Sequence, residues 1–444
     1  MLFGTAGIRG DMHTITPECA LSLGKSVAQF CRAHGGSRIV VGKDGRTSSD
    51  MLSQSVQAGI LSQNCSVTDI GLVPTPVLAY ASKDCGIMIT ASHNPPQYNG
   101  MKVFFQHREL FPHEEQEIEK LMNAPAAPIS WELPSITPSD VLSSYIQALL
   151  SYIKKEWKTS HVAKRVVVDC GNGMGALVTP HILNKMGCTV IPLFNEIRGI
   201  FQRSAEPSAS HILLARKTVV SQQADLGIAH DGDADRINVI DEKGNVIPED
   251  SIIAFLAGVY AGESDHVITS IDTSLRIDEY VACKGGITDR VMLGNLHEGV
   301  CTYNAVFAGE PWKHIHVKFG PWIDGIVSAA VLTCAIKDIP ASRLCAQINE
   351  YPMEKINITT ENREYLCALF DKEIRHLSGI KEILTISGTR ANFSDGSWIL
   401  VRPSGTEPKV RIVIEGVTPH KFHSLKEFVD KTLNQSKYLY SIVN

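Results

Sequence analysis

Three stretches of this chain repeat one pattern, a run of β-branched residues that ends in an aspartate within a turn. They are Arg38–Gly45, Arg165–Gly173 and His266–Thr273. A continuous β-branched run is typical of a strand that is buried on both faces of a parallel sheet. The repeats lie roughly a hundred residues apart, which is the size of a domain and not of a solenoid repeat. Two interpretations remain open. The chain contains three similar α/β domains, or these strand–Asp turns simply recur, as they do in many α/β proteins.

The pattern of predicted secondary structure changes after Pro352, where short β runs flank a helical segment at 363–377. This mixture predicts a small α+β domain at the C-terminal end. A proline-rich stretch at 124–138, followed by a long amphipathic helix at 139–158, separates the first two repeats. We therefore predict an α/β protein of three mixed α/β domains, at residues 1–140, 141–247 and 248–350, and an α+β domain at 351–444.

Composition excludes several classes of protein. A net charge of −5 argues against a general nucleic-acid binder. Eleven cysteines without any C-x-x-C pair indicate free thiols in a reducing compartment. The first residues lack the basic and apolar regions of a signal peptide, and no apolar run is long enough to span a bilayer. We expect a cytoplasmic protein with no membrane or nucleic-acid partner.

Ser92 lies in a short polar loop, Thr90–Pro96, directly after the apolar run Gly86–Ile89. Two prolines stiffen this loop, and Asn99-Gly100 marks a second tight turn. A rigid turn at the end of a strand holds a hydroxyl group at the edge of the sheet, as a nucleophile or a covalent carrier requires. No G-x-S-x-G elbow surrounds Ser92, so acyl transfer is not indicated.

Asp231, Asp233 and Asp235 alternate along a loop that follows the apolar run Leu226–Ala229. Three close carboxylates repel one another unless a cation lies between them. Oxygen ligands favour a hard ion, Mg²⁺ first. An EF-hand is excluded because the sixth residue of the loop is Arg236 and not glycine. The alternative is a solvated acidic turn without a metal.

Three further turns carry groups that bind anions or sugars. Gly4–Gly10 is rich in glycine and contains Arg9, whose guanidinium group offers several donors to an anion. Arg402–Arg411 gathers two arginines, a lysine and two hydroxyl groups, the donors that a dianionic phosphate requires; the alternative is a polar hairpin. The turn Ala308–His314 is either a sugar-binding loop or a surface loop, and its polar residues are Glu310, Lys313 and His314.

A lone serine, a metal-binding loop and a separate phosphate clamp together indicate phosphoryl transfer. A serine with no general base nearby is poorly suited to hydrolysis, but it can carry a phosphoryl group. A bound metal would neutralise the charge of that group and the charge that develops during transfer.

In these motifs and in their order along the chain, the sequence resembles the α-D-phosphohexomutase superfamily, and most of all its archaeal-type branch. This superfamily includes phosphoglucomutase, phosphomannomutase and phosphoglucosamine mutase. The resemblance implies four domains in a heart shape, three of them similar. It implies that phosphorylated Ser92 donates its phosphoryl group to a hexose phosphate and recovers the other one from the resulting bisphosphate, with a hexose bisphosphate as activator.

The resemblance also implies roles for single residues. Ser92 with its phosphate, Asp231, Asp233 and Asp235 would hold Mg²⁺. Arg9 and Lys102 would transfer protons or stabilise charge, and His93 would lie beside them. The substrate would be bound by Arg236, Glu310, Lys313, His314, Arg402, Ser404, Gly405, Thr406 and Arg411.

One loop departs from the pattern of the superfamily. Most members read G-E-x-S-G-H at the sugar loop, whereas this chain has Trp312 and Lys313 in place of Ser and Gly. The segment Gly199–Pro207 also lacks the histidine that is usual there. We expect a phosphoglucosamine mutase acting as a monomer or homodimer, with a broad phosphomannomutase/phosphoglucomutase as the alternative.

Two other hypotheses come from different classes. A phosphatase that uses the aspartate loop would need a Thr or Val where Arg236 stands. A non-catalytic sugar-phosphate binding protein would fit the altered sugar loop, although the serine and all three aspartates are present.

Overall fold

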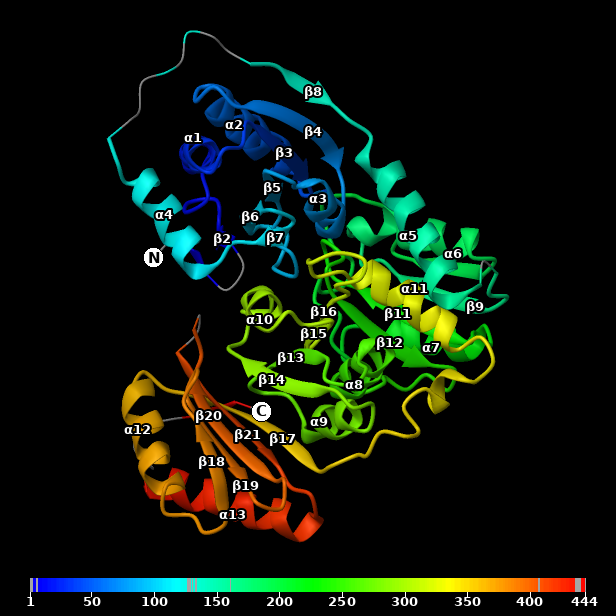
Figure 1. The fold of residues 1–444 in the computed structure, drawn as a ribbon, viewed down its shortest axis with the longest axis vertical. Coiled ribbons are helices and arrows are strands. Elements are labelled where there is room, and N and C mark those ends of the chain that lie inside the picture. The colour runs from blue at the N-terminus through cyan, green and yellow to red at the C-terminus, as the bar shows by residue number, and fades with distance from the viewer. Residues whose placement is uncertain are drawn as a thin grey trace. The chain divides into compact units, whose positions relative to one another are not determined.

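The computed structural model describes residues 3–4, 7–125, 129, 131, 134–159, 161–405, 408–435 and 441–443. Four sheets with flanking helices succeed one another along the chain (Figure 1), which confirms the mixed α/β class. The chain divides into two compact units. The first unit consists of Met1–Glu249, Val306–Ala308 and Trp312–Ala346, and the second of Asp250–Ala305, Gly309–Pro311 and Gln347–Asn444.

The first sheet has the order β1-β2-β6-β5-β3-β4-β8, with β7 paired to β6. Parallel pairing joins β3 to both β4 and β5, and β6 runs antiparallel to β5. The strands are β1 (Phe3–Gly4), β2 (Gly7–Gly10), β3 (Arg38–Lys43), β4 (Ser66–Leu72), β5 (Cys85–Ile89), β6 (Asn99–Phe105), β7 (Arg108–Glu109) and β8 (Ile136–Pro138). The helices are α1 (Pro17–Ala33), α2 (Ser49–Leu61), α3 (Thr75–Ala81) and α4 (Pro112–Met122).

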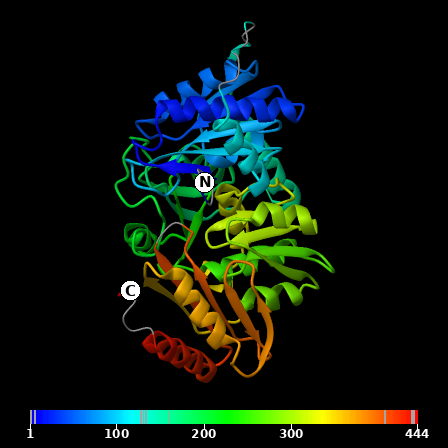
Figure 2. The same ribbon diagram turned by 90° about the vertical axis from the view of Figure 1, so that its left-hand side faces the viewer.

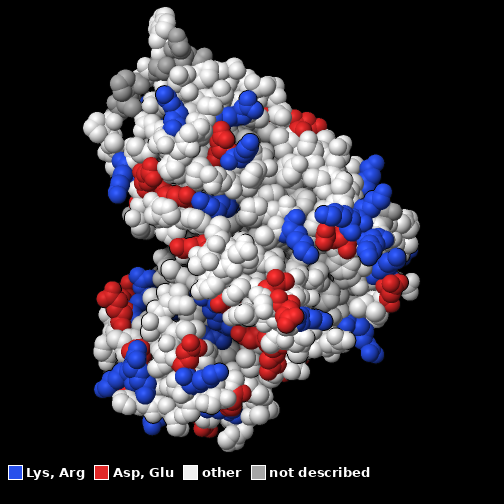
Figure 3. Space-filling model, viewed as in Figure 1, with Lys and Arg blue, Asp and Glu red and all other residues white. Residues whose placement is uncertain are grey.

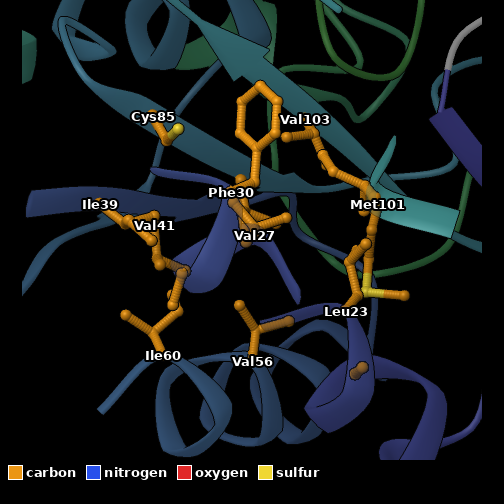
Figure 4. Packing of buried hydrophobic residues seen from close by; sticks show 14 of the residues in the cluster. Leu23, Val27, Phe30, Ile39, Val41, Val56, Ile60, Cys85, Met101 and Val103 are labelled. Atoms are coloured by element: carbon orange, nitrogen blue, oxygen red, sulfur yellow. The ribbon is translucent and has the colours of Figure 1, made fainter. Parts of the chain in front are cut away.

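The core of this sheet lies against α1 and α2 (Figure 4). Apolar residues three or four apart form the buried face of each helix, which is the spacing of an amphipathic helix. They include Leu23, Val27 and Phe30 on α1 and Val56 and Ile60 on α2, which pack toward Ile39, Val41, Cys85, Met101 and Val103 on the strands. The two helices approach closely at Gly24, where a Cβ atom would lie 2.3 Å from the Val56 carbonyl oxygen.

The second sheet has the order β10-β9-β11-β12, with β9 parallel to both β10 and β11. Its strands are β9 (Arg165–Asp169), β10 (Thr189–Leu193), β11 (Leu226–His230) and β12 (Ile237–Asp241), and the helices of this region are α5 (Val141–Trp157), η1 (Met174–Leu177), α6 (Thr179–Lys185) and α7 (Leu213–Ser221). The helix predicted over 139–158 is confirmed as α5, which begins where Asp140 accepts a hydrogen bond from the Ser143 N–H. Because β11 and β12 are antiparallel neighbours, the short loop between them projects from one end of the sheet.

The third sheet has the order β14-β13-β15-β16, and β13 pairs in parallel with β14. Its strands are β13 (His266–Ser270), β14 (Ile287–Val291), β15 (Phe307–Glu310) and β16 (Lys313–Ile315), and the helices of this region are α8 (Glu249–Tyr260), α9 (Leu275–Ala282), α10 (Leu296–Tyr303) and α11 (Gly325–Ala335). Each of the three repeated β-branched runs is therefore a strand with a neighbour on both sides, in three different sheets. This arrangement supports three similar domains over a chance recurrence of turns.

The fourth sheet is antiparallel, in the order β18-β19-β20-β21-β17-β22. Helices α12 (Arg363–Ile374) and α13 (Pro419–Gln435) pack on it (Figure 2), as an α+β arrangement requires. Its strands are β17 (Met353–Thr359), β18 (Ile380–Leu384), β19 (Thr389–Phe393), β20 (Trp398–Pro403), β21 (Lys409–Glu415) and β22 (Ser441–Val443), and a short turn of helix, η2 (Ala341–Arg343), precedes them. The four sheets fall inside the four predicted ranges, while the domain bounds themselves stay predictions.

Surface charge is mixed in sign on the face drawn in Figure 3, in keeping with a net charge of −5. All eleven cysteines are free thiols, as their spacing predicts. In the part of the chain that the structure describes, no helix has the length and apolar character needed to cross a membrane.

Candidate active site

Ser92 is held in the loop between β5 and β6 of the first unit. Its side chain is buried, and its backbone adopts the left-handed conformation with φ of 49°. The Thr90 hydroxyl oxygen accepts a hydrogen bond from the Ser92 N–H at 2.9 Å. The Ser92 hydroxyl group donates to Asp231 Oδ2 at 2.8 Å, and His93 Nδ1 lies 3.4 Å from Ser92 Oγ. The loop therefore directs the hydroxyl group at the aspartate loop of the second sheet.

The three aspartates of that loop converge on one point. One ligand oxygen from each of Asp231, Asp233 and Asp235 lies within 4.8 Å of the others. All three residues are at most 1% exposed, so the loop is not a solvated acidic turn. Thr75 at the start of α3 secures Asp233, since its hydroxyl group donates to Asp233 Oδ2 at 2.5 Å and its N–H to the Asp233 carbonyl at 3.0 Å.

Lys102 on β6 contributes a positive charge to this cluster. Its Nζ donates to Asp233 Oδ2 at 2.7 Å and to Asp235 Oδ2 at 2.6 Å. Burial acts to lower the pKa of Lys102, but the two carboxylates outweigh it and raise that pKa, so the ammonium form is stabilised. Burial acts to raise the pKa of Asp233, yet Lys102 holds it below its usual range.

For Asp231, the attraction of Arg236 and Lys102 does not offset the effect of burial on the pKa. Burial, followed by repulsion from Asp235 and Asp233, raises the pKa of its carboxyl group well above the usual range. In addition, Asp233 Oδ1 and Asp235 Oδ1 are buried and accept no hydrogen bond from any described residue. Buried carboxylate oxygens without donors are expected where a cation belongs. The cluster therefore has the oxygen donor set, with two open carboxylate oxygens, to hold a metal ion.

Basic side chains surround the cluster. Arg9 on β2 donates from Nη1 to Asn94 Oδ1 at 3.4 Å, and Arg236 Nε lies 3.9 Å from Asp231 Oδ2 and 4.0 Å from Asp235 Oδ1. Burial lowers the pKa of His93 to about 2, with further lowering by Arg236, Arg9 and Lys313, so this imidazole is neutral. This concentration of cations beside a serine hydroxyl favours binding of a phosphoryl group.

The atypical loop after β15 lies partly in the first unit. Trp312 has a left-handed backbone with φ of 68°, and its carbonyl oxygen accepts a hydrogen bond from Ile237 N–H at 3.0 Å. Its ring centroid lies 6.0 Å from the Arg236 guanidinium carbon, and Lys313 pairs with Arg236 in an antiparallel bridge. His314 is buried with Nδ1 3.0 Å from Ser328 Oγ, and burial lowers its pKa to about 3. Trp312 and Lys313 therefore lie beside Arg236.

The second unit holds the remaining predicted residues. Glu310 is buried and accepts a hydrogen bond from Gly294 N–H at 2.9 Å. Arg402 and Arg411 face each other across β20 and β21, and Arg402 Nη2 lies 3.5 Å from Asp272 Oδ2. Two neighbouring arginines on a strand pair form a strongly cationic site, which an anion would stabilise. Ser404 and Gly405 follow in the turn, and Thr406 lies outside the described residues.

The structure thus brings together, in the first unit, Ser92, Arg9, His93, Lys102, Asp231, Asp233, Asp235, Arg236 and Lys313. In the second unit it pairs Arg402 with Arg411. Two residues of the site were not predicted from the sequence, namely Thr75, which binds Asp233, and Arg46, which donates a hydrogen bond to the Ser92 carbonyl oxygen. Nothing in the sequence around Thr75 marks it. Arg46 follows the first of the repeated strand–Asp turns, at Asp44-Gly45, and this repeat is the one sequence feature that points to it.

Comparisons with known proteins agree with this geometry. The chain matches the models of phosphoglucomutase/phosphomannomutase alpha/beta/alpha domain I at residues 1–128, domain II at 143–244 and the C-terminal domain at 356–432. It is 41% identical to a phosphopentomutase of Thermococcus kodakarensis and 35% identical to a Thermococcus gammatolerans protein named as a probable phosphoglucosamine mutase, in each case over 98% of both chains.

Solved structures share the fold. A phosphoglucomutase/phosphomannomutase family protein of Burkholderia thailandensis superposes with a TM-score of 0.86, at 23% identity, over 99% of this chain and 98% of that chain. An N-acetylphosphoglucosamine mutase of Aspergillus fumigatus, solved in complex with GlcNAc-6P and magnesium, gives a TM-score of 0.61 at 14% identity, over 98% and 95% of the chains. The chain belongs to the phosphoglucomutase/phosphomannomutase family. It is an isomerase that transfers a phosphoryl group within a sugar phosphate.

Proposed function

We propose that this enzyme interconverts a sugar 1-phosphate with the sugar phosphorylated at its terminal hydroxyl group, using Ser92 as the phosphoryl carrier and Mg²⁺ as the cofactor. The observation that carries this proposal is the hydrogen bond of 2.8 Å from the Ser92 hydroxyl group to Asp231 Oδ2. The proposal is supported because this hydroxyl group contacts a buried cluster of three carboxylates.

The reaction consists of two phosphoryl transfers, and Ser92 is phosphorylated again at the end of the second. In the first, the bond between phosphorus and Ser92 Oγ breaks, a bond from phosphorus to the sugar hydroxyl oxygen forms, and the hydroxyl proton is released to a base. The product is a sugar bisphosphate. In the second, Ser92 Oγ takes the other phosphoryl group and a proton returns to the freed sugar oxygen. A trace of bisphosphate therefore acts as an activator, since it phosphorylates Ser92 at the start.

Residues of the first unit supply the charge that these transfers need. Asp231, Asp233 and Asp235, with the phosphate on Ser92, would hold Mg²⁺, which neutralises phosphoryl oxygens and polarises phosphorus when bound. Lys102, paired with Asp233 and Asp235, holds a fixed positive charge at the cluster. Arg9, which donates to Asn94, and Lys102 are our candidates for proton transfer or charge stabilisation, and His93 lies beside Ser92.

The phosphate that is not transferred would be bound in the second unit by Arg402, Ser404, Gly405, Thr406 and Arg411. The turn is open at Gly405, where an added Cβ atom would meet no described atom within 4 Å. An arginine pair provides planar forks that match phosphate oxygens. We assign contacts with the sugar hydroxyl groups to Arg236, Glu310, Lys313 and His314.

Two substrate classes follow from the sequence and its relatives. Glucosamine phosphate is the first, since relatives at 35–37% identity are named as probable phosphoglucosamine mutases. Pentose phosphate is the second, and a specific observation favours it, namely the 41% identity to a phosphopentomutase. A broad hexose phosphate specificity is the remaining alternative. The eleven free thiols support a cytoplasmic location for this reaction.

Phosphorus NMR of the purified protein with Mg²⁺ and a trace of sugar bisphosphate tests the proposal. The phosphates of glucosamine, glucose, mannose and ribose are supplied in turn. We expect isomerisation of at least one of them, lost on Ser92→Ala and on removal of Mg²⁺. Full turnover by the Ser92→Ala variant would overturn the carrier role. Release of inorganic phosphate in excess of isomerisation would indicate a phosphatase, and binding without any isomerisation would indicate a sugar-phosphate binding protein.

A further inference from the structure

Arg46 is a buried residue of the first unit whose guanidinium group is completely satisfied by hydrogen bonds. Its Nε donates to Asp44 Oδ2 at 3.0 Å. Each of the two remaining nitrogens donates two hydrogen bonds to main-chain carbonyl oxygens of a single loop. Nη1 reaches Pro95 at 2.6 Å and Tyr98 at 3.1 Å, and Nη2 reaches Ser92 at 3.0 Å and Asn94 at 2.8 Å. All five N–H groups of the side chain are therefore used.

The four carbonyl oxygens belong to the loop that carries Ser92. Of these four residues only Ser92 is buried, and an irregular loop has no strand ladder to provide donors for its carbonyl groups. The planar guanidinium group of Arg46 supplies four donors, so it fixes the positions of the four peptide units relative to one another. Residues 92 to 98 are thus wrapped around a single rigid fork.

Asp44 fixes the fork in turn. It stands directly after β3, and its N–H donates to the carbonyl of Ile89 at the end of β5 at 2.9 Å. Asp44 Oδ1 accepts hydrogen bonds from the Arg46 N–H at 3.0 Å and from the Ser49 hydroxyl group at 2.6 Å. Because β3 and β5 are parallel neighbours, their carboxyl ends meet at one edge of the sheet. The repeated strand–Asp turn therefore anchors the serine loop in this domain.

Ser92 has a conformation that needs such support. A φ of 49° is unfavourable for a residue with a side chain, and it persists only where its surroundings enforce it. The Ser92 carbonyl oxygen is held by Arg46 on one side and lies against Gly232 on the other, where a Cβ atom would be only 2.4 Å away. Rotation about the Ser92 N–Cα bond moves the carbonyl group and Oγ together, so bonds that fix the N–H and the carbonyl oxygen also fix the direction of Oγ.

We propose that Arg46 is a positioning residue that sets the left-handed conformation of Ser92 and so directs its hydroxyl group at the metal cluster. All five N–H groups of the Arg46 side chain are taken by the protein itself, which leaves none to bind a substrate phosphate. The inference rests on the proposed role of Ser92 as phosphoryl carrier. A lysine cannot replace Arg46, because an ammonium group has three donors on one nitrogen atom and cannot reach four separate carbonyl oxygens.

The test compares Arg46→Lys and Arg46→Ala with a matched control. Arg108→Lys and Arg108→Ala serve as the control, since Arg108 is also buried in the first unit, with a two-point ion pair to Glu114 at 2.7 and 2.8 Å, and makes no contact with the loop among its described hydrogen bonds. Measurements are kcat, KM, the phosphorylation of Ser92 by bisphosphate followed by intact mass, and hydrogen exchange of the amides of residues 90–99.

We expect kcat of both Arg46 variants to fall about 100-fold or more with KM changed by less than about threefold, because a misplaced nucleophile reduces the rate and leaves substrate binding intact. Ser92 should be phosphorylated more slowly by a similar factor, and the loop amides should exchange faster. Guanidinium ions at low concentration should raise the kcat of Arg46→Ala about tenfold and leave the kcat of Arg108→Ala unchanged. The Arg108 variants should keep wild-type kcat and loop exchange.

An Arg46→Lys variant with kcat within about threefold of wild type and unchanged loop exchange would overturn the inference, provided that Ser92→Ala is inactive. Full activity of Ser92→Ala would instead overturn the proposed function, so the two failures are distinct. If Arg46→Ala does not fold, Arg46→Lys and Asp44→Asn give the same decision, since Asp44→Asn weakens the anchor of the fork and should show the same fall in kcat with unchanged KM.

Discussion

Lys102 Nζ lies 2.6 Å from Asp235 Oδ2 in the interior of the first unit, where both side chains are 2% exposed. The same ammonium group donates to Asp233 at 2.7 Å. Lys102 thus pairs with two of the three buried carboxylates, while Asp233 Oδ1 and Asp235 Oδ1 accept no hydrogen bond from any described residue. These two open oxygens link the stability of the unit to the binding of a divalent cation.

Substitution Lys102→Met should therefore destabilise the metal-free protein. Removing one partner of a buried ion pair typically costs about 3–5 kcal/mol, because the remaining charges are left uncompensated. Thermal unfolding in EDTA should show a clearly lower Tm for the variant than for the wild type. Addition of Mg²⁺ should raise the Tm of the variant by more than it raises the Tm of the wild type. Lys164→Met, which breaks a partly exposed pair with Asp225 at 3.3 Å, is the control and should cost under about 1 kcal/mol. Equal losses in the two variants would contradict the expectation.

Asp324 should make stability depend on pH. Its carboxyl group is buried at the start of α11, where it accepts hydrogen bonds from Tyr145 at 2.7 Å and Trp322 at 2.9 Å. Burial raises its pKa from 3.8 to about 6, so the folded state binds the proton more tightly than the unfolded state. The resulting stabilisation is fully present below about pH 4 and is lost as the pH rises through about 6.

The Asp324→Asn variant lacks this titration. Urea unfolding should show that its free energy of unfolding, relative to wild type, improves by up to about 3 kcal/mol between pH 4 and pH 7. Tyr145→Phe, which removes a donor that lowers the pKa of Asp324, should make the pH dependence of the otherwise wild-type protein steeper. A constant difference between Asp324→Asn and wild type across this range would rule out the titration of Asp324.

Trp312 should influence the choice of sugar. Its ring lies 6.0 Å from the Arg236 guanidinium carbon, and its backbone φ of 68° is one that glycine adopts without strain. If the sugar binds at Arg236 as we propose, we expect Trp312→Gly to raise kcat/KM for hexosamine phosphates relative to pentose phosphates by about tenfold, because removal of the indole opens space for a larger sugar. Trp312→Phe keeps an aromatic ring and should keep the wild-type ratio. An unchanged ratio in Trp312→Gly would exclude a role in selectivity.

Arg402 should act on substrate affinity and not on the chemical step. It faces Arg411 across β20 and β21, in the turn that we assign to the phosphate that is not transferred. Steady-state kinetics of Arg402→Lys should show KM raised by about tenfold or more with kcat changed much less, since a lysine cannot form two parallel hydrogen bonds to phosphate. Arg375→Lys, in the exposed pair with Asp371, should leave both constants unchanged. A fall in kcat at constant KM would contradict this assignment.

Much of the local structure could be predicted because it depends on neighbours in the chain. The β-branched run at 38–43 predicted a strand, which is β3, and the apolar spacing over 139–158 predicted a helix, which is α5. The convergence of Asp231, Asp233 and Asp235 could be predicted because alternate carboxylates after a buried strand are costly without a cation. The phosphate clamp around Arg402 stays a prediction, which rests on its density of donors.

The partners of these residues could not be predicted, because they come from distant parts of the chain. Thr75 meets Asp233 across 158 positions, and Lys102 meets it across 131. The apolar pattern shows which strands are buried, but their order in the sheet depends on packing of the whole layer. Nothing around Thr75 in the sequence distinguishes it from any other residue that begins a helix.

The sequence by itself determined the class of chemistry, since the residue types in the serine, aspartate and arginine turns allow few reactions besides phosphoryl transfer. Only the tertiary structure decided how the serine is aimed. Strands β3 and β5 had to pair in parallel before Arg46, which follows β3, could reach four carbonyl groups of the loop that follows β5. Side-chain chemistry is a property of single residues, whereas the direction of a hydroxyl group depends on where separate strands end together.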